Sequence, residues 1–447
     1  MTTLSTELTP AIALPTAAPV SETARIRLID ALRGVALLGI LLMNIPGFSM
    51  PNYFSESFKS NPGDVNFWVS AVISVVFEGK MRALFGMLFG AGVLLFVSQK
   101  ASAGQSTTWL FIRRMLWLVL FGLFHAHVIL WIGDILYLYG WCGIIVYLCR
   151  KIKPKYLVLC VPIVGLIDFG VGVGVHQFFR MRRIEYVQAK AVEQTGIPLT
   201  ESQQTAIEKW EELEKNFIPN REQAKENTQK MKSDYATVGG YIRPMALKGQ
   251  TIFMPIEVWD SLALMFLGLA LYQWGFLTGQ WSNKSYKIVM AVGYGLGLPL
   301  AAYSFYHGVV YSPNLEAALL RLEQVAIPWT GLIYPFQRML LVMAHVSLLT
   351  LLYKWNWLQG LFARLEAVGR MAFTNYIMHS VICTLFFFGY GLNYFAEFQY
   401  YQIYFVVLAI WILQLVVSPI WLRYFRFGPL EWLWRSLTYW KRQPMWR

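Results

Sequence analysis

The sequence has few charged residues and few cysteines. Only 14% of its 447 residues are Asp, Glu, Lys or Arg, whereas 56% are hydrophobic and 18 are tryptophan. This balance excludes an ordinary soluble domain, in which about a quarter of the residues are charged. The four cysteines show neither a disulfide framework nor the Cys/His spacing of a metal site, so we expect no disulfide scaffold and no metal. They are Cys142, Cys149, Cys160 and Cys383.

The common catalytic and phosphate-binding motifs are also missing. The sequence contains no GxxxxGK[ST], no GxSxG, no HExxH and no paired CxxC, which argues against ATP hydrolysis and a zinc site. A formal net charge of +13 would suggest nucleic acid in a soluble chain. Because the basic residues here fall at the ends of apolar runs, we expect no nucleic-acid partner. Residues 1–24 lack a basic segment before an apolar core, so they predict a disordered tail and not a signal peptide.

Long apolar runs are what the sequence does contain. A membrane-spanning helix needs roughly 17–25 mostly apolar residues. By this criterion the chain is predicted to be an all-α, polytopic integral membrane bundle of about ten transmembrane helices. Residues 66–77 are apolar but too short to span alone, and could form an interfacial or re-entrant helix. The predicted spans are 28–47, 82–98, 112–132, 134–149, 156–177, 252–276, 286–306, 332–353, 371–391 and 403–422.

Basic residues recur at alternate ends of these spans, which predicts that both termini are cytoplasmic. The polar segment 180–250 then lies outside, as a helical cap or lid over the outer face. It divides the N-terminal transmembrane helices (25–179) from the C-terminal ones (251–427). Residues 428–447 predict a cytoplasmic interfacial amphipathic helix in which Glu431 and Arg435 pair four residues apart. No internal repeat supports an inverted-repeat transporter.

The first span carries polar residues at hydrocarbon depth. Asp30 and Arg33 are three residues apart, within pairing reach on a helix. Arg33 and Asn44 are eleven apart, about three turns, so they share one stripe roughly 16 Å long. Polar groups placed like this usually face a bundle interior or a wet cavity. The first span is therefore expected to be more than an anchor.

A second group of ionisable residues lies in the third predicted span and at its exit. His125 and His127 lie about 200° apart on a helix and cannot share a face. Either suits general-base chemistry because its pKa lies near neutrality. Asp134 could hold the second ring nitrogen, and it could meet His127 if the helix continues to Gly133. The alternative is a structural histidine that bonds a backbone carbonyl.

Further polar candidates lie mostly toward the predicted outer half. Glu78 and Arg82 are spaced to pair, which leaves Lys80 on another face, as cations for an anionic acceptor or as an interfacial snorkelling cluster. Asn375 and His379 share one helix face four residues apart. Glu257 and Asp260 could share a proton if both are buried. Other buried polar candidates are Asp168, Arg338, Arg370 and Tyr376.

Taken together, five motifs of the chain resemble the YeiB-type bacterial membrane proteins. The resemblance covers nearly the whole chain outside the first 24 residues. The motifs are Asp30-x-x-Arg33-Gly34…Asn44, Phe77-Glu-Gly-Lys-x-Arg-x-Leu-Phe-Gly86, Gly122-Leu-x-His125…Trp131-x-Gly-Asp134, Gly369-Arg-Met-Ala-x-Thr-Asn-Tyr376 and Gly428-Pro-Leu-Glu-Trp-Leu-Trp-Arg435.

This resemblance implies a protein of the bacterial cytoplasmic (inner) membrane with a domain of unknown function, grouped with transmembrane acyltransferases. That superfamily includes the lysosomal enzyme that moves an acetyl group from cytosolic acetyl-CoA to a terminal glucosamine of heparan sulfate. The lysosomal enzyme has a catalytic histidine shortly after the residue that matches Asn44. Here no histidine lies between Asn44 and His125, so this carry-over fails and His125 becomes the substitute candidate.

The leading hypothesis is an acyltransferase with acyl-CoA as co-substrate and an outer-face sugar, glycan or lipid headgroup as acceptor. Its alternative is a proton-coupled small-molecule transporter that uses the same polar groups, and a third is a scaffold or sensor. Membrane lipids are the expected partners, and the aromatic surface permits a homodimer. The assigned residues are His125, Asp134 and Asn44 for catalysis; Asp30, Arg33, Arg113 and Arg114 for the cofactor; and Glu78, Lys80, Arg82, Asn375 and His379 for the acceptor.

Overall fold

The computed structural model describes residues 26–51, 61–101, 108–218 and 221–447, so the predicted tail 1–24 lies outside the described residues. Helices form nearly all of this part, and no β-strand occurs in it beyond one isolated bridge between Phe425 and Trp446. The all-α prediction is confirmed. The helices are α1 (Arg27–Ser49), α2 (Val65–Val72), α3 (Lys80–Ala101), α4 (Thr108–His127), α5 (Leu136–Leu148), α6 (Pro154–Gln194), α7 (Glu201–Phe217), α8 (Arg221–Met231), α9 (Tyr235–Lys248), α10 (Met254–Gln273), α11 (Asn283–Tyr311), α12 (Leu315–Gln324), α13 (Ile333–Lys354), α14 (Gln359–Arg370), α15 (Ala372–Phe387), α16 (Ile403–Tyr424) and α17 (Pro429–Tyr439).

Eight stretches of the described chain are long and apolar enough to cross a membrane. Each of the ten predicted spans overlaps one of the helices, but α5 has 13 residues and α15 has 16. Both are shorter than the roughly 17 residues that a hydrocarbon core requires. The predicted helix at 66–77 is present as α2 and a π-helical turn, Ile73–Phe77.

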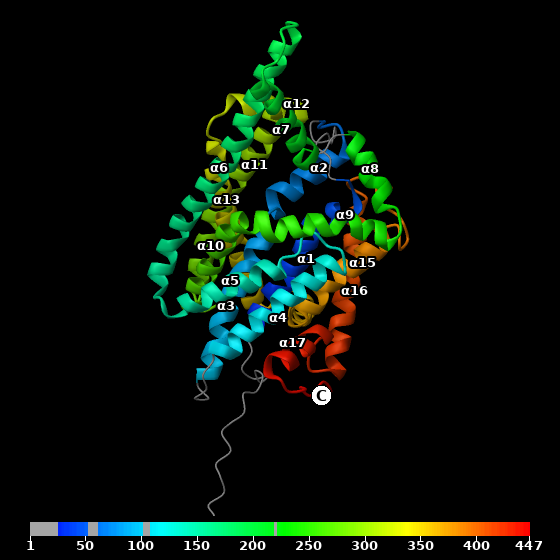
Figure 1. The fold of residues 1–447 in the computed structure, drawn as a ribbon. Coiled ribbons are helices and arrows are strands. Elements are labelled where there is room, and N and C mark those ends of the chain that lie inside the picture. The colour runs from blue at the N-terminus through cyan, green and yellow to red at the C-terminus, as the bar shows by residue number, and fades with distance from the viewer. Residues whose placement is uncertain (1–25, 52–60, 102–107, 219–220) are drawn as a thin grey trace, which may run out of the picture.

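Helix α1 lies at the centre of the bundle and is buried along most of its length (Figure 1). It contacts α14 so closely that two glycines are required at the crossing. A Cβ at Gly34 would lie 2.2 Å from the Leu365 carbonyl oxygen, and one at Gly369 would lie 1.8 Å from that of Asp30. Only glycine allows this backbone approach. The crossing brings Asp30 and Arg33 beside the junction of α14 and α15.

Helices α6, α11 and α16 lie on the outside and expose apolar side chains. Leu159, Ile163 and Leu166 of α6 are each more than half exposed, as are Leu296 of α11 and Phe405 of α16. An apolar surface this large marks a membrane or protein contact in a natural chain. These helices are therefore the lipid-facing surface expected of a polytopic membrane protein.

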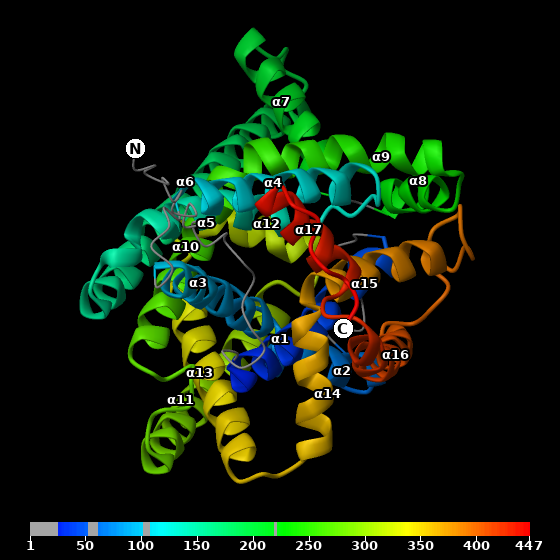
Figure 2. The same cartoon turned by 90° about the horizontal axis from the view of Figure 1, so that it is seen from below.

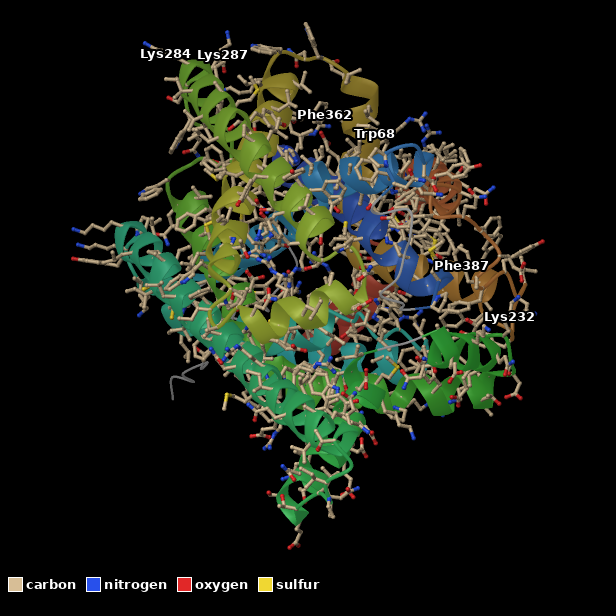
Figure 3. The ribbon with its side chains drawn as sticks, turned by 90° about the horizontal axis from the view of Figure 1, so that it is seen from above. Trp68, Lys232, Lys284, Lys287, Phe362 and Phe387 are labelled. Carbon is tan, nitrogen blue, oxygen red and sulfur yellow. The ribbon has the colours of Figure 1, made fainter. Side chains whose placement is uncertain are left out.

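The two ends of the bundle differ. Helix α17 and the C-terminus lie at one end, and α7 and α12 lie at the other, while α9 crosses the bundle (Figure 1). Seen from below, α17 lies against α4 and near α15 (Figure 2). The exposed side chains of Lys284 and Lys287, at the start of α11, project outward from the molecule (Figure 3). The segment 180–250 is helical as expected, and its location outside the cell stays a prediction.

Candidate functional site

A buried polar site in the middle of the fold is built on His125, near the end of α4. After His127 the chain leaves the helix and turns through Leu130, which has a positive φ of 64°. This turn returns Asp134 to His125, whose Nδ1 lies 2.7 Å from Asp134 Oδ1. Asp134 Oδ2 accepts a further bond from the Tyr137 backbone N–H at 2.9 Å. The carboxylate therefore fixes the ring tautomer with the proton on Nδ1.

Ser380 of α15 completes this site. Its Oγ lies 2.8 Å from His125 Nε2, and the hydroxyl donates because Nδ1 carries the ring proton. The side chains are almost inaccessible, with His125 0% and Ser380 1% exposed. Sequence analysis missed Ser380, since 255 residues separate it from His125 and no fixed spacing signals the contact.

His127 takes a different partner. Because α4 ends at His127, the helix does not continue to Gly133, and the alternative contact between His127 and Asp134 is wrong. The Nε2 of His127 lies 2.9 Å from Gln250 Oε1 instead. The helix α9 covers this end of α4, where Arg243 Nε donates to the His127 carbonyl at 3.0 Å.

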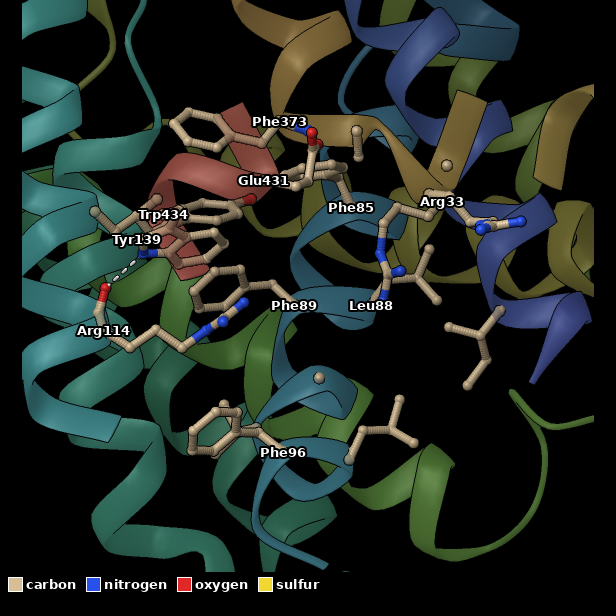
Figure 4. Close-up of a pocket in the computed structure, with 18 of the residues that line it drawn as sticks. Arg33, Phe85, Leu88, Phe89, Phe96, Arg114, Tyr139, Phe373, Glu431 and Trp434 are labelled. Atoms are coloured by element: carbon tan, nitrogen blue, oxygen red, sulfur yellow. Dashed lines mark hydrogen bonds between the residues drawn. The ribbon is translucent and has the colours of Figure 1, made fainter. Parts of the chain in front are cut away.

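A cavity of about 290 Å³ lies among α1, α3, α4, α15 and α17. We call it the arginine cavity. Arg33 and Arg114 lie on opposite sides of it, with the rings of Phe85, Phe89 and Tyr139 also in its wall (Figure 4). Its charged lining residues are Asp30, Arg33, Arg114, Arg370, Glu431 and Arg435, four cations and two carboxylates. The formal excess of two positive charges beside an apolar wall suits an anion with a hydrophobic part.

The arginines of this cavity are held by neighbours. Arg33 Nη1 donates to Asp30 Oδ1 at 2.7 Å, which confirms the predicted pairing reach. The Arg114 guanidinium lies 3.7 Å from the centre of the Trp434 ring and 5.4 Å from that of Phe96. The Trp434 indole in turn donates to the Arg114 carbonyl at 2.9 Å. Stacking on aromatic rings leaves guanidinium N–H groups available for a bound anion.

Arg113 is not in the wall of the arginine cavity. Its guanidinium lies 5.8 Å from the centre of the Trp440 ring. Successive residues on a helix are rotated by about 100°, so Arg113 and Arg114 diverge. The two residues were both assigned to the cofactor, and the structure brings only Arg114 to Asp30 and Arg33.

Tyr376 links the arginine cavity to His125. Its side chain lines the cavity, and its ring centre lies 5.2 Å from that of His125. The hydroxyl donates to the Gly133 carbonyl and accepts from the Ile135 N–H, both at 3.3 Å. Tyr376 thus braces the turn that carries Asp134.

The predicted pair of Glu78 and Arg82 is wrong. Gly79, with a φ of 72°, interrupts the helix between them, so the helical spacing does not apply. Arg82 Nη2 donates to Asp260 Oδ2 at 2.7 Å, and Arg338 also donates to this carboxylate. Because two arginines hold Asp260, and Glu257 is exposed, the proposed shared proton between Glu257 and Asp260 is wrong as well.

The other residues assigned to the acceptor lie elsewhere. Lys80 is buried and donates to the Ser74 carbonyl at 2.8 Å. Asn375 and His379 share one face of α15 and both bond Gln414 of α16, through the Asn375 carbonyl and His379 Nε2. The structure therefore separates Glu78, Lys80 and Arg82 from Asn375 and His379. Asn44 of α1 is half-buried. It does not bond the His125 ring, whose two nitrogens bond Asp134 and Ser380.

In the part of the chain that the structure describes, no three His, Cys, Asp or Glu side chains gather into a group that could hold a metal ion. The site consists instead of a buried Asp–His–Ser chain beside a cationic cavity. This arrangement can activate a hydroxyl without a metal, because the histidine accepts a proton while the carboxylate stabilises its charge.

Comparison with known proteins finds relatives of nearly the same length. Residues 271–441 match a family model described as a protein of unknown function, DUF418. The chain is 28% identical over 439 residues to the uncharacterized protein YxaH of Bacillus subtilis (strain 168), covering 96% of this chain and 97% of the relative. It is 29% identical over 428 residues to the uncharacterized protein YeiB of Escherichia coli (strain K12), covering 92% and 95%. No solved structure matches the chain.

Proposed function

Taking this chain as a YeiB-type membrane protein, as its motifs and these relatives indicate, we propose that it is a membrane-embedded acyltransferase. It moves an acyl group from cytosolic acyl-CoA to an extracytoplasmic acceptor such as a sugar, a glycan or a lipid headgroup. The observation that carries this proposal is the arginine cavity, which adjoins a buried histidine paired with a carboxylate.

The donor suits the arginine cavity in both of its chemical parts. Arg33, Arg114 and Arg435 are the groups that bind phosphates, since guanidinium N–H donors match phosphate oxygens. The wall of Phe85, Phe89 and other apolar side chains accepts the pantetheine arm and the acyl chain. Glu431, Trp434 and Arg435 of α17 line the cavity, and the positive-inside pattern predicts that the end of the bundle with α17 is cytoplasmic.

The reaction centre lies where Tyr376 separates the cavity from His125. The thioester carbonyl approaches past Tyr376, and His125 receives the proton that leaves the attacking hydroxyl. Asp134 stabilises the imidazolium that forms. The acceptor enters from the opposite side, beneath α9, where Tyr235 donates to the Val128 carbonyl at 2.7 Å.

The test is binding of acetyl-CoA and a long-chain acyl-CoA to the full-length protein in nanodiscs, measured by calorimetry. We expect saturable binding that weakens about tenfold or more in Arg33→Gln and in Arg114→Gln, because a hydrogen bond to a charged group contributes on the order of 2 kcal/mol. The matched control is Arg113→Gln, adjacent on α4 but directed at Trp440, which should bind almost as well as the wild type.

No binding at millimolar acyl-CoA by folded protein would overturn the acyltransferase proposal. The alternative is a proton-coupled transporter, and one observation favours it: Asp260 lies between Arg82 and Arg338 within the spans. Charged groups at this depth commonly mark transport or proton pathways. Proton-driven substrate accumulation in vesicles, lost in Asp260→Asn and independent of acyl-CoA, would establish that function instead.

A further inference from the structure

We propose that Ser380 is the nucleophile of this site and carries the acyl group as an ester between donor and acceptor. This inference rests on the proposed acyltransferase function and adds to it a covalent intermediate and a catalytic residue. It follows from the hydrogen-bond chain of Asp134, His125 and Ser380, whose two links measure 2.7 and 2.8 Å.

The hydrogen bonds from Ser380 to His125 and from His125 to Asp134 run in the direction that an activated nucleophile requires. Asp134 accepts a hydrogen bond from the Nδ1–H of His125, which leaves the Nε2 lone pair facing the Ser380 hydroxyl. The hydroxyl then donates to a base that can remove its proton. Both oxygens of Asp134 are engaged, because Tyr137 N–H binds the second, so the carboxylate cannot turn away from the ring.

The hydroxyl of Ser380 bonds a neighbouring helix and not its own. A serine or threonine within a helix often donates to the carbonyl four residues earlier, as Ser49 of α1 does to Ile45 and Thr228 of α8 does to Ala224. Ser380 lies inside α15 and donates to His125 of α4 instead. The side chain is therefore committed to the histidine and not to its own helix.

The alternative mechanism, direct attack by the acceptor, meets an obstacle at the same atom. Nε2 is the basic nitrogen of His125, and Ser380 occupies it. An acceptor hydroxyl would first have to displace Ser380 from a site where both residues are almost fully buried. A covalent route needs no such displacement, because Ser380 itself is the group that His125 deprotonates.

Two balanced steps follow. In the first, Ser380 Oγ attacks the thioester carbonyl, His125 Nε2 takes the hydroxyl proton, and the C–S bond breaks. The proton passes to the departing CoA sulfur, which leaves as the thiol, and the acyl group remains as an ester on Ser380. In the second, the acceptor hydroxyl or amine attacks the ester, His125 takes its proton, and that proton returns to Oγ as the C–O bond breaks.

The donor reaches Ser380 along α15. Tyr376, one turn before Ser380 on this helix, lines the arginine cavity and contacts the His125 ring. Tyr376 in the cavity wall and Ser380 at His125 are thus on adjacent turns of α15. The acyl group reaches Ser380 when the Tyr376 ring moves aside.

The experiment is covalent labelling of the full-length protein in nanodiscs. The probes are acyl-CoA without acceptor and, separately, a fluorophosphonate, which modifies activated serines without any need for the cavity arginines. Intact mass and peptide mapping should place both labels on Ser380. Labelling should fall at least 100-fold in Ser380→Ala and in His125→Gln.

The matched control is Ser418→Ala. Ser418 is equally buried on the neighbouring α16, where its Oγ accepts from Asn375, and its loss should leave labelling unchanged. Ser380→Ala should still bind acyl-CoA as the wild type does, which separates this inference from donor binding. If wild-type protein binds acyl-CoA but neither probe reaches Ser380, or if Ser380→Ala keeps full transfer, the nucleophile assignment is wrong while the acyltransferase proposal stands. If acyl-CoA does not bind at all, both fail.

Discussion

At the scale of single residues, two histidines on one helix have different surroundings. His125 faces the interior and holds Asp134 and Ser380, whereas His127 lies at the helix end and bonds Gln250 of the segment that follows α9. The difference arises because side chains two positions apart on a helix point about 200° away from each other. Of these two histidines, His125 is the one with both a carboxylate that fixes its tautomer and a hydroxyl at its basic nitrogen.

These histidines give a matched pair of substitutions. His125→Gln should lower acyl transfer by about 10²–10⁴-fold at saturating acyl-CoA, because it removes the acid–base group. His127→Gln should stay within a few-fold of the wild type. The measurement is the initial rate of transfer to an acceptor mixture, with thermal unfolding of each variant as the folding control. Equal loss in both variants, with both folded, would contradict the assignment.

At the scale of elements, α17 supplies a cap that α15 lacks. No side chain caps the start of α15 from its own N-cap residue, Met371. The Glu431 carboxylate of α17 instead accepts from the Phe373 and Thr374 N–H groups at 2.7 and 3.0 Å, and from Thr374 Oγ1 at 2.6 Å. An anion at a helix N-terminus satisfies free N–H groups and complements the helix dipole. The sequence-based pairing of Glu431 with Arg435 overlooked this contact between helices.

Removing the Glu431 side chain should destabilise the protein, whereas replacing its carboxylate with an amide should not. Glu431→Ala leaves buried donors without an acceptor and should lower the free energy of unfolding by on the order of 2 kcal/mol. Glu431→Gln keeps an oxygen for the two N–H groups and should unfold near the wild-type temperature. The exposed Glu208→Ala on α7 is the control for loss of a carboxylate. A stable Glu431→Ala protein would show that the cap is dispensable.

The same carboxyl group predicts a pH dependence. Burial raises the pKa of Glu431 above its ordinary value of 4.5, against the opposing effect of its hydrogen bonds from Thr374 and Phe373. A raised pKa means that the folded protein holds the proton more tightly than the unfolded chain. Its contribution to stability is therefore complete below pH 4.5 and is lost as the pH rises through the raised value. The difference in unfolding temperature between the wild type and Glu431→Gln, followed from pH 4 to 8, should show this loss. A difference that grows in favour of the wild type as the pH rises would contradict it.

At the scale of the whole molecule, the proposal depends on which side of the membrane each end faces. Helix α17 lies at one end and α7 at the other, and the basic short loops predict that the end with α17 is cytoplasmic. Acyl-CoA is made in the cytosol, so this orientation is a requirement of the donor site.

Cysteine accessibility tests the orientation. In a background with the half-buried Cys149 and Cys160 replaced by alanine, Glu208→Cys on α7 should react with a membrane-impermeant maleimide in intact spheroplasts. Lys284→Cys at the start of α11 should react only after permeabilisation. Both positions are exposed in the structure, so access depends on the membrane alone. The reverse pattern would place the arginine cavity on the extracytoplasmic side of the membrane and would contradict a cytosolic acyl-CoA donor.

Sequence patterns predicted the spans well because length and apolarity are local properties. The end of α4 could not be predicted, since it depends on the positive φ of Leu130 in an otherwise apolar run. The contact of Asp134 with His125 could be predicted from the sequence because the two positions are only nine apart. The contact of His125 with Ser380 could not, because it depends on how α15 packs against α4. Arg82 was given the wrong partner because Gly79 breaks the helical spacing on which the prediction relied.

The position of α17 in the chain has a consequence for biosynthesis. This helix follows every span in sequence, yet Glu431, Trp434 and Arg435 line the arginine cavity. During translation the spans can insert while the wall that α17 provides is still within the ribosome, so the cavity stays open until the last helix docks. A chain that stops before Pro429 would insert into the membrane with the arginine cavity open on the side that α17 closes.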